Sequence, residues 1–214
     1  MRLQLNFAIL IGLIFILMLP EISYAHHPYS PKRHMTSTHS TINHEYFCAD
    51  VKESSVSISS AYNELKRILY NRNYDGLAGN KIYLVASNTN LNCSDMSASI
   101  LNGYYLRYYI EANTQPRCDG TSSCIVRYGP TQQSDGHTHY AYAVVTIREQ
   151  TWNNLREYIV NHETGHFLGL RDGSGSSNCP GSIMHSKDYG CSNGYPANPY
   201  QNDLNTVISE ANSN

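Results

Sequence analysis

Runs of β-branched and aromatic residues predict three strands in this chain. Residues 81–86 and 140–147 form the two longer runs, and residues 125–128 form a shorter one. Such side chains suit the pleated surface of a sheet, which is why we interpret all three as strands. The run at 140–147 is the clearest, and a helical pattern follows it directly.

Apolar residues at helical spacing predict two helices in the first half of the chain. The first can be capped by Ser60 and runs to about Asn71. The second lies between residues 95 and 112, where large apolar side chains return every four residues despite Gly103. The stripe of the first consists of Leu65, Ile68 and Leu69, and that of the second of Ile100, Leu101, Tyr104, Tyr105, Tyr108 and Tyr109.

Two further helices are predicted in the second half. One begins between Thr151 and Asn154, either of which can cap it, and Gly169 ends it. Two histidines continue its apolar stripe. The apolar part of the helix would pack in the core and thereby fix the position of these histidines. The other spans residues 202–211. The inward positions are Leu155, Tyr158, Ile159, His162 and His166 in the first, and Leu204, Val207 and Ile208 in the second.

The start of the chain has a pattern typical of export. Arg2 precedes an apolar run at 7–19, and Ser23 and Ala25 are small residues at the positions that a signal peptidase reads. The run is shorter than the about 20 residues of a membrane span, so we do not expect a membrane anchor once the signal is removed. We predict a signal peptide at 1–25, a polar, histidine-rich disordered lead-in or short pro-segment at 26–45, and a folded domain at 46–214.

Composition adds limits to this picture. The 214 residues are 41% apolar and 15% charged, which suits one domain with a sizeable core. The net charge of -2 and the lack of basic blocks argue against a nucleic acid partner. We therefore expect a secreted, extracellular monomer.

All six cysteines lie after the predicted cleavage site, and an even number in an exported chain favours disulfides. Short loops favour pairing Cys118 with Cys124 and Cys179 with Cys191, which leaves Cys48 with Cys93, although sequence alone leaves the pairing open. In the alternative, Cys48 is a free thiolate that blocks a metal ion in a latent precursor, and one other cysteine is then unpaired.

The candidate chemistry lies on the third predicted helix. His162 and His166 stand four residues apart, so both imidazoles leave one face of the helix and can bind one metal ion. Glu163 lies beside them, where a carboxylate reaches a water at the metal without being a ligand. This H-E-x-x-H spacing is typical of zinc peptidases, in which the metal acidifies a water and the glutamate removes its proton as general base.

A catalytic zinc ion needs a third protein ligand. Gly169 can adopt the left-handed conformation that ends a helix and reverses the chain, and this reversal would bring Asp172 back to the metal. Nothing around Glu210 resembles the second-helix signature of thermolysin-like enzymes. We therefore predict Asp172 as the third ligand, ahead of the other downstream candidates, which are His185, Asp188, Asp203 and Glu210.

These residues together resemble the elongated zinc motif of the metzincins, HExxHxxGxxD, in the form ending in Asp that snapalysin-type secreted bacterial peptidases carry. The likeness runs from about residue 140 to 200. Met184, within Ser-Ile-Met-His, resembles the methionine turn under the zinc of those families. Ser186 stands where some metzincins have a tyrosine that steadies the oxyanion, and Tyr189 or Tyr195 could substitute.

The resemblance implies an α+β, metzincin-like fold with a twisted mixed sheet, a backing helix, the active-site helix and an irregular, disulfide-braced C-terminal half. It implies one catalytic Zn²⁺ and leaves open whether a structural calcium ion is also bound. A protein or peptide substrate would pair with an edge strand ahead of the active helix, either 124–128 or 140–147. Residues 173–199 would carry Met184 and form one wall of the specificity pocket.

We therefore expect a secreted zinc-dependent endopeptidase, a hydrolase. One alternative is an exported metal-binding interaction module without turnover, against which Glu163 argues because a binder needs no general base. Another is a zinc amidase acting on a non-protein peptide, such as a cell-wall peptide, with which the sequence is equally compatible.

Overall fold

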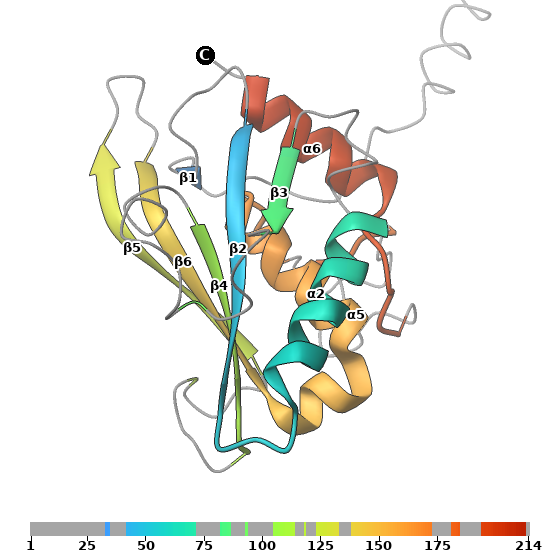
Figure 1. Cartoon of the computed structure of the whole chain (residues 1–214). Helices are drawn as coiled ribbons and strands as arrows, with labels where there is room; N and C mark the ends of the chain where they lie inside the picture. Colours follow the sequence, from blue (N-terminus) through green and yellow to red (C-terminus); the bar gives the residue numbers. More distant parts are fainter. Residues whose placement is uncertain are drawn as a thin grey trace, which may run out of the picture.

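The computed structural model describes residues 33–34, 42–71, 82–86, 93, 105–113, 118, 123–132, 138–172, 181–184 and 194–212. Within these ranges a mixed sheet carries helices on one of its sides (Figure 1). The predicted α+β class is confirmed.

The sheet contains six strands in the described part of the chain, and β6 lies between β5 and β4 (Figure 1). The path along the sheet is β1-β6-β4-β2-β3, and β5 pairs with β6 outside this path. Only the β5–β6 pair is antiparallel among the pairs described. The strands are β1 (Arg33–His34), β2 (Ile42–Lys52), β3 (Ile82–Ala86), β4 (Tyr105–Glu111), β5 (Ser123–Gln132) and β6 (Thr138–Arg148).

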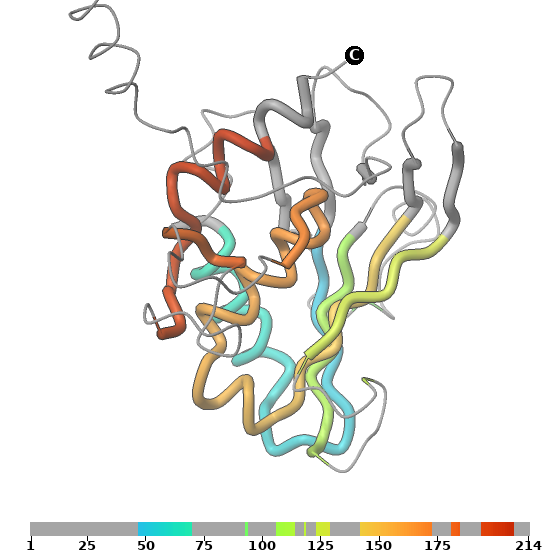
Figure 2. The backbone as a smooth tube through the Cα atoms, turned by 180° about the vertical axis from the view of Figure 1, so that it is seen from behind, coloured from blue at the N-terminus to red at the C-terminus, as the bar shows by residue number. Residues whose placement is uncertain are grey.

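The described helices are α2 (Ile58–Asn71), α5 (Glu149–Phe167) and α6 (Gln201–Asn212). All of them lie on the same side of the sheet, as the two opposite views show (Figures 1 and 2). Helix α2 packs on β2 and β3, and α5 packs on β4, β5 and β6. The core lies between these two layers, so the sheet supports the helix that carries the candidate chemistry.

Helix α2 confirms the predicted apolar stripe. Leu65, Ile68 and Leu69 are fully buried in the core. The predicted cap is wrong, because the Ser57 hydroxyl accepts the N–H of Ser60 at 3.2 Å and the helix begins at Ile58. Ser57 stands one residue before the helix, which is the position from which a side-chain oxygen reaches the third helical N–H.

The predicted helix at 95–112 is wrong where the structure describes it, because residues 105–111 form β4. Every second side chain there, those of Leu106, Tyr108 and Ile110, is fully buried in the core. A spacing of four residues returns to the same face in a strand as well as in a helix, so the tyrosine pattern fits both periods. Tyrosine favours strands, and pairing with β2 and β6 on either side decides the outcome. Residues 95–104 lie outside the described part.

Part of the predicted disordered lead-in also belongs to the sheet. Strand β1 lies within it, and β2 begins at Ile42, ahead of the expected domain start at Tyr46. Sheet pairing uses backbone groups, so a polar sequence does not prevent it. The expected strands at 81–86, 125–128 and 140–147 are confirmed as β3 and as parts of β5 and β6.

Two disulfides join described cysteines. Cys48 on β2 is bonded to Cys93, and Cys118 is bonded to Cys124 at the start of β5. Both pairs confirm the predicted pairing, and the alternative in which Cys48 is a free thiolate is wrong. Cys179 and Cys191 lie outside the described residues.

None of the helices in the described ranges combines the length and apolar character needed to cross a membrane.

Candidate metal centre

Helix α5 carries the candidate site and begins earlier than predicted. It starts at Glu149 without a side-chain cap from Arg148, and Leu155 interrupts it with φ −136° and ψ 20°. The Glu149 carboxylate instead accepts hydrogen bonds from the backbone N–H and the hydroxyl of Ser55. The prediction of a start between Thr151 and Asn154 is therefore wrong, since the turn ahead of the kink is also helical.

The end of α5 follows the prediction. Gly169 has φ 95°, in the left-handed region, and its N–H bonds to the carbonyl of His166 at 3.2 Å. The N–H of Leu170 reaches the carbonyl of Gly165 at 2.9 Å, and the Leu170 side chain is fully buried. These two bonds form a Schellman end, which satisfies the last carbonyls and reverses the chain.

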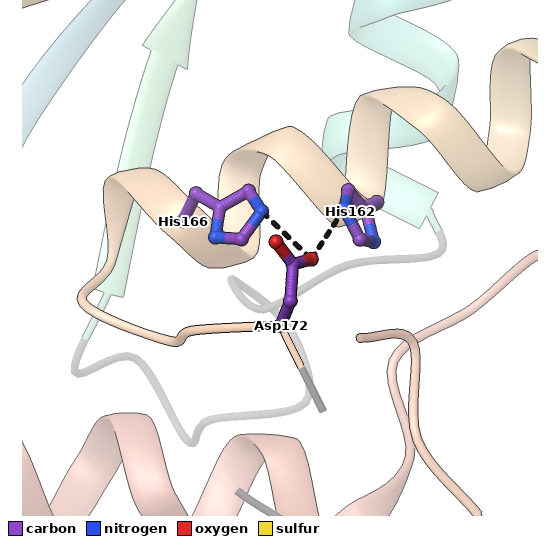
Figure 3. A group of neighbouring side chains, drawn as sticks. All are labelled: His162, His166 and Asp172. Atoms are coloured by element: carbon purple, nitrogen blue, oxygen red, sulfur yellow. Dashed lines mark ion pairs between the residues drawn. The ribbon is translucent and has the colours of Figure 1, made fainter. Parts of the chain in front are cut away.

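The reversal brings the three predicted ligands together. Asp172 Oδ1 lies 3.3 Å from His162 Nε2 and 3.2 Å from His166 Nε2 (Figure 3). One ligand atom from each residue lies within 4.8 Å of the others. Both histidines are buried and Asp172 is exposed, so the group could bind a metal ion that is reached from the surface.

The hydrogen bonds of the two imidazoles fit a metal site. Nδ1 of His162 lies 3.1 Å from the carbonyl of Ile183, and Nδ1 of His166 lies 2.8 Å from the carbonyl of Leu170. A carbonyl oxygen only accepts, so each Nδ1 carries a proton. Both Nε2 atoms therefore face Asp172, on the side where a metal ion would take the place of their protons, and metal-binding histidines are commonly oriented in this way.

The charges of the group reinforce one another. Partial loss of water around the carboxylate raises the pKa of Asp172, but hydrogen bonds from His162 and His166 outweigh this and hold that pKa well below its usual range. Burial lowers the pKa of His162, yet the hydrogen bond to Asp172 and the charge of Glu163 outweigh this, so the pKa is raised. The carboxylate is therefore ionised, which is the form that binds a cation.

Glu163 lies next to the ligands but outside their group. It is buried, and its Oε1 accepts a hydrogen bond of 2.7 Å from the hydroxyl of Ser123, the first residue of β5. Further along β5, the Arg127 guanidinium donates to the carbonyl of His166. Neither contact was predicted, because nothing in the local sequence of β5 indicates its partner on α5.

Met184 is fully buried, and its neighbour Ile183 supplies the carbonyl that holds His162. The predicted turn thus lies against a candidate ligand. Tyr195 is connected to the site through Tyr158: the two rings are 5.1 Å apart, and the Tyr158 hydroxyl lies 3.2 Å from His162 Nδ1. Ser186 and Tyr189 fall outside the described residues.

A cavity of about 290 Å³ adjoins this tyrosine pair. Residues 153–158 of α5 form one side of it, and Tyr195 and Ala197 form another. The described part of the irregular segment therefore lines a hollow at Tyr158, one turn of α5 ahead of His162.

A comparison with protein-family models gives no match, and neither does a comparison with curated proteins. The interpretation of the site consequently depends on its own geometry.

Proposed function

We propose that this chain is a secreted zinc-dependent endopeptidase of metzincin-like architecture. The observation that carries the proposal is the convergence of His162, His166 and Asp172 beside a buried carboxylate, Glu163, that is not one of the converging ligands. Two imidazoles and one carboxylate form a donor set that suits zinc, and three protein ligands are the usual number at a catalytic zinc ion.

Each residue has one role in the proposed reaction. His162, His166 and Asp172 would hold the zinc, which when bound lowers the pKa of a water and polarises a carbonyl. Glu163 would accept the proton of the attacking water and later donate it to the leaving amine. Ser123, through its hydrogen bond to Oε1, would keep the Glu163 carboxylate in one orientation for both transfers.

The sheet favours β5 as the strand that receives substrate. β6 has neighbours on both sides, whereas among the described residues β5 pairs only with β6. An extended peptide could therefore be added along the outer edge of β5. Because Ser123 and Arg127 connect β5 to α5, such a peptide would pass close to Glu163.

The cavity beside Tyr158 and Tyr195 would take one side chain of that peptide. Its volume of about 290 Å³ is near the lower end of the range for small-ligand sites, which suits a single side chain. This assignment follows the expectation that the segment before Pro199 forms one wall of a specificity pocket.

The burial of Glu163 favours hydrolysis over an interaction module. An ionised carboxylate is costly to bury, and a site that only binds metal gains nothing from one that is not a ligand. A zinc amidase acting on a non-protein peptide would use the same groups, so the choice of substrate must separate the two.

The test is casein hydrolysis by the wild type and Glu163→Gln, with the zinc content of both proteins measured. We expect about one zinc ion per chain in each. We also expect a loss of activity of about 10²- to 10⁴-fold in the variant, which is typical for removal of a general base. Glu149→Gln makes the same change at the other end of α5 and should retain both properties.

The outcomes separate the candidate functions. If a chelator abolishes casein cleavage and added zinc restores it, the peptidase assignment stands. If wild type holds zinc but cleaves no casein, cell-wall peptides are tested next. If these are not cleaved either, the chain is interpreted as a metal-binding interaction module. If neither protein holds zinc, the ligand assignment is wrong.

A further inference from the structure

A continuous chain of hydrogen bonds connects His162 to a buried carboxylate on α6. Nδ1 of His162 donates to the carbonyl of Ile183 at 3.1 Å. The N–H of the same peptide group, that of Met184, donates to the hydroxyl of Ser182 at 2.9 Å. That hydroxyl donates in turn to Oδ1 of Asp203 at 2.7 Å. Every donor in the chain thus points from the imidazole toward the carboxylate.

Asp203 is held from several sides. Its side chain has no exposed surface, and Oδ2 accepts the N–H of Ile183 at 2.9 Å and that of Tyr200 at 2.8 Å. The bond to Tyr200 caps α6, whereas the bonds to Ile183 and Ser182 fix the turn that carries Met184. One carboxylate therefore joins the last helix to the turn beside the candidate metal centre.

The direction of these bonds has an electronic consequence. In a chain of hydrogen bonds each group polarises the next, and the effect is stronger in a buried, low-dielectric site. The negative charge of Asp203 makes the carbonyl of Ile183 a stronger acceptor for the proton on His162 Nδ1. An imidazole that donates to such a partner is oriented and is a more basic ligand at Nε2.

We propose that Ser182 and Asp203 are positioning residues of the metal centre, which act through the peptide group between Ile183 and Met184 to orient His162 and strengthen its binding of a metal ion. The proposal rests on the metal site of the proposed function and not on the nature of the substrate. The predicted methionine turn would then have a role besides packing, because its backbone connects the Asp203 carboxylate on α6 to His162.

Ser182→Ala is the first test, because it interrupts the chain and leaves the bonds from Asp203 to Ile183 and Tyr200 in place. Zinc affinity is measured by competition with a chromophoric chelator, together with the melting temperature. We expect the affinity to fall by about 10- to 100-fold, the usual effect of losing an outer partner of a metal-bound histidine. Ser182→Thr keeps the hydroxyl and should restore most of it.

Asp203→Asn provides a second variant, with the melting temperature measured because Asp203 also caps α6. It should lower zinc affinity at a temperature at which the protein is still folded. If folded Ser182→Ala and Asp203→Asn both bind zinc as tightly as wild type, the proposal is overturned.

Nitrogen-15 NMR of the histidine rings in the metal-free protein gives a readout that a merely structural role would not change. In wild type and in Ser182→Thr we expect a visible signal from the proton on His162 Nδ1. In Ser182→Ala we expect this signal to shift or to broaden through exchange. The signals of His166, whose Nδ1 donates to Leu170, should not change and serve as an internal control. Equal changes at both rings would indicate general loosening and contradict the proposal.

The two proposals fail separately. A wild-type protein that binds zinc but hydrolyses no peptide would overturn the proposed activity and leave the Ser182 comparison valid. Unchanged zinc affinity in the variants of an active enzyme would overturn the positioning role alone.

Discussion

Asp172 is the single residue on which the metal assignment depends most. It lies outside α5, it is exposed, and it contacts both histidines through one carboxylate oxygen. Its two ion pairs hold the carboxylate against the two Nε2 atoms that would bind the metal. A residue placed in this way contributes affinity mainly through its charge.

Asp172→Asn tests this assignment. The substitution keeps the shape and removes the charge, so zinc affinity should fall by more than the roughly 10- to 100-fold that loss of an outer hydrogen-bond partner costs. Isothermal titration with zinc measures the change. Arg171→Gln alters the exposed residue next to it and should bind zinc as wild type does; equal affinities for all three proteins would place the metal elsewhere.

At the scale of the element, the end of α5 determines where Asp172 lies. Gly169 has φ 95°, and the backbone bonds of Gly169 and Leu170 close the helix three residues before Asp172. An L side chain rarely adopts this conformation. The site therefore depends on a backbone property of one glycine.

Gly169→Ala should lower the free energy of unfolding by about 1 kcal/mol or more and also weaken zinc binding, because relief of the strain moves the segment that carries Asp172. Chemical denaturation and zinc titration measure the two effects. Gly194→Ala is the matched control: Gly194 has φ 67° and open space around the position of a side chain, so it should lose stability without losing zinc affinity. If Gly169→Ala binds zinc as tightly as wild type, the metal site does not depend on the backbone conformation of Gly169.

At the scale of the whole molecule, a charged network holds α2 against α5. Glu64 accepts hydrogen bonds from Arg67 at 2.9 Å and from Arg156 at 3.0 Å, and Arg67 also reaches Glu157 at 2.6 Å. The hydrogen bond from Arg67, followed by that from Arg156, outweighs partial burial and holds the pKa of Glu64 below its ordinary value of 4.5. The network lies next to the kink at Leu155, and its members Arg156 and Glu157 also line the candidate pocket.

This lowered pKa predicts how stability responds to acid. A carboxyl whose pKa is lower in the folded state stabilises the protein above its unfolded pKa, and the contribution is lost as the pH falls from about 4.5 through the folded value. Glu64→Gln should therefore lower the melting temperature near neutral pH and show a shallower fall in acid. The groups are partly exposed, so the effect should be small and should shrink in high salt. If the melting temperatures of the two proteins fall equally as the pH is lowered, the prediction is wrong.

Several features of the fold and the site could be predicted from local sequence. The spacing of His162 and His166, the helix end at Gly169 and the two described disulfides are confirmed, because each involves a pattern or a loop that the sequence displays. The strand β2 was not predicted, since its mixed sequence shows no clear period. The strand β4 was predicted as a helix because tyrosines four residues apart suit both structures.

Contacts between distant elements were not accessible in this way. Tyr108 shows this: its hydroxyl lies 2.7 Å from Thr164 on α5, and burial raises the pKa of the phenol above its ordinary range. From the sequence alone, Tyr108 is one of several aromatic residues in a repeating pattern, and its partner cannot be predicted. Its pairing with Thr164 depends on β4 being central in the sheet, which strand pairing decides.

The sequence by itself determined the candidate chemistry: two histidines on one helical face, a glutamate between them, and an aspartate after a glycine that reverses the chain. Only the tertiary structure decided that β5 pairs with β6 alone among the described strands, that Ser123 contacts Glu163, and that Asp203 holds the turn beside His162. The physical reason is distance along the chain. Helical spacing and helix ends are set by neighbouring residues, whereas these partners meet only when the sheet and α6 pack around α5.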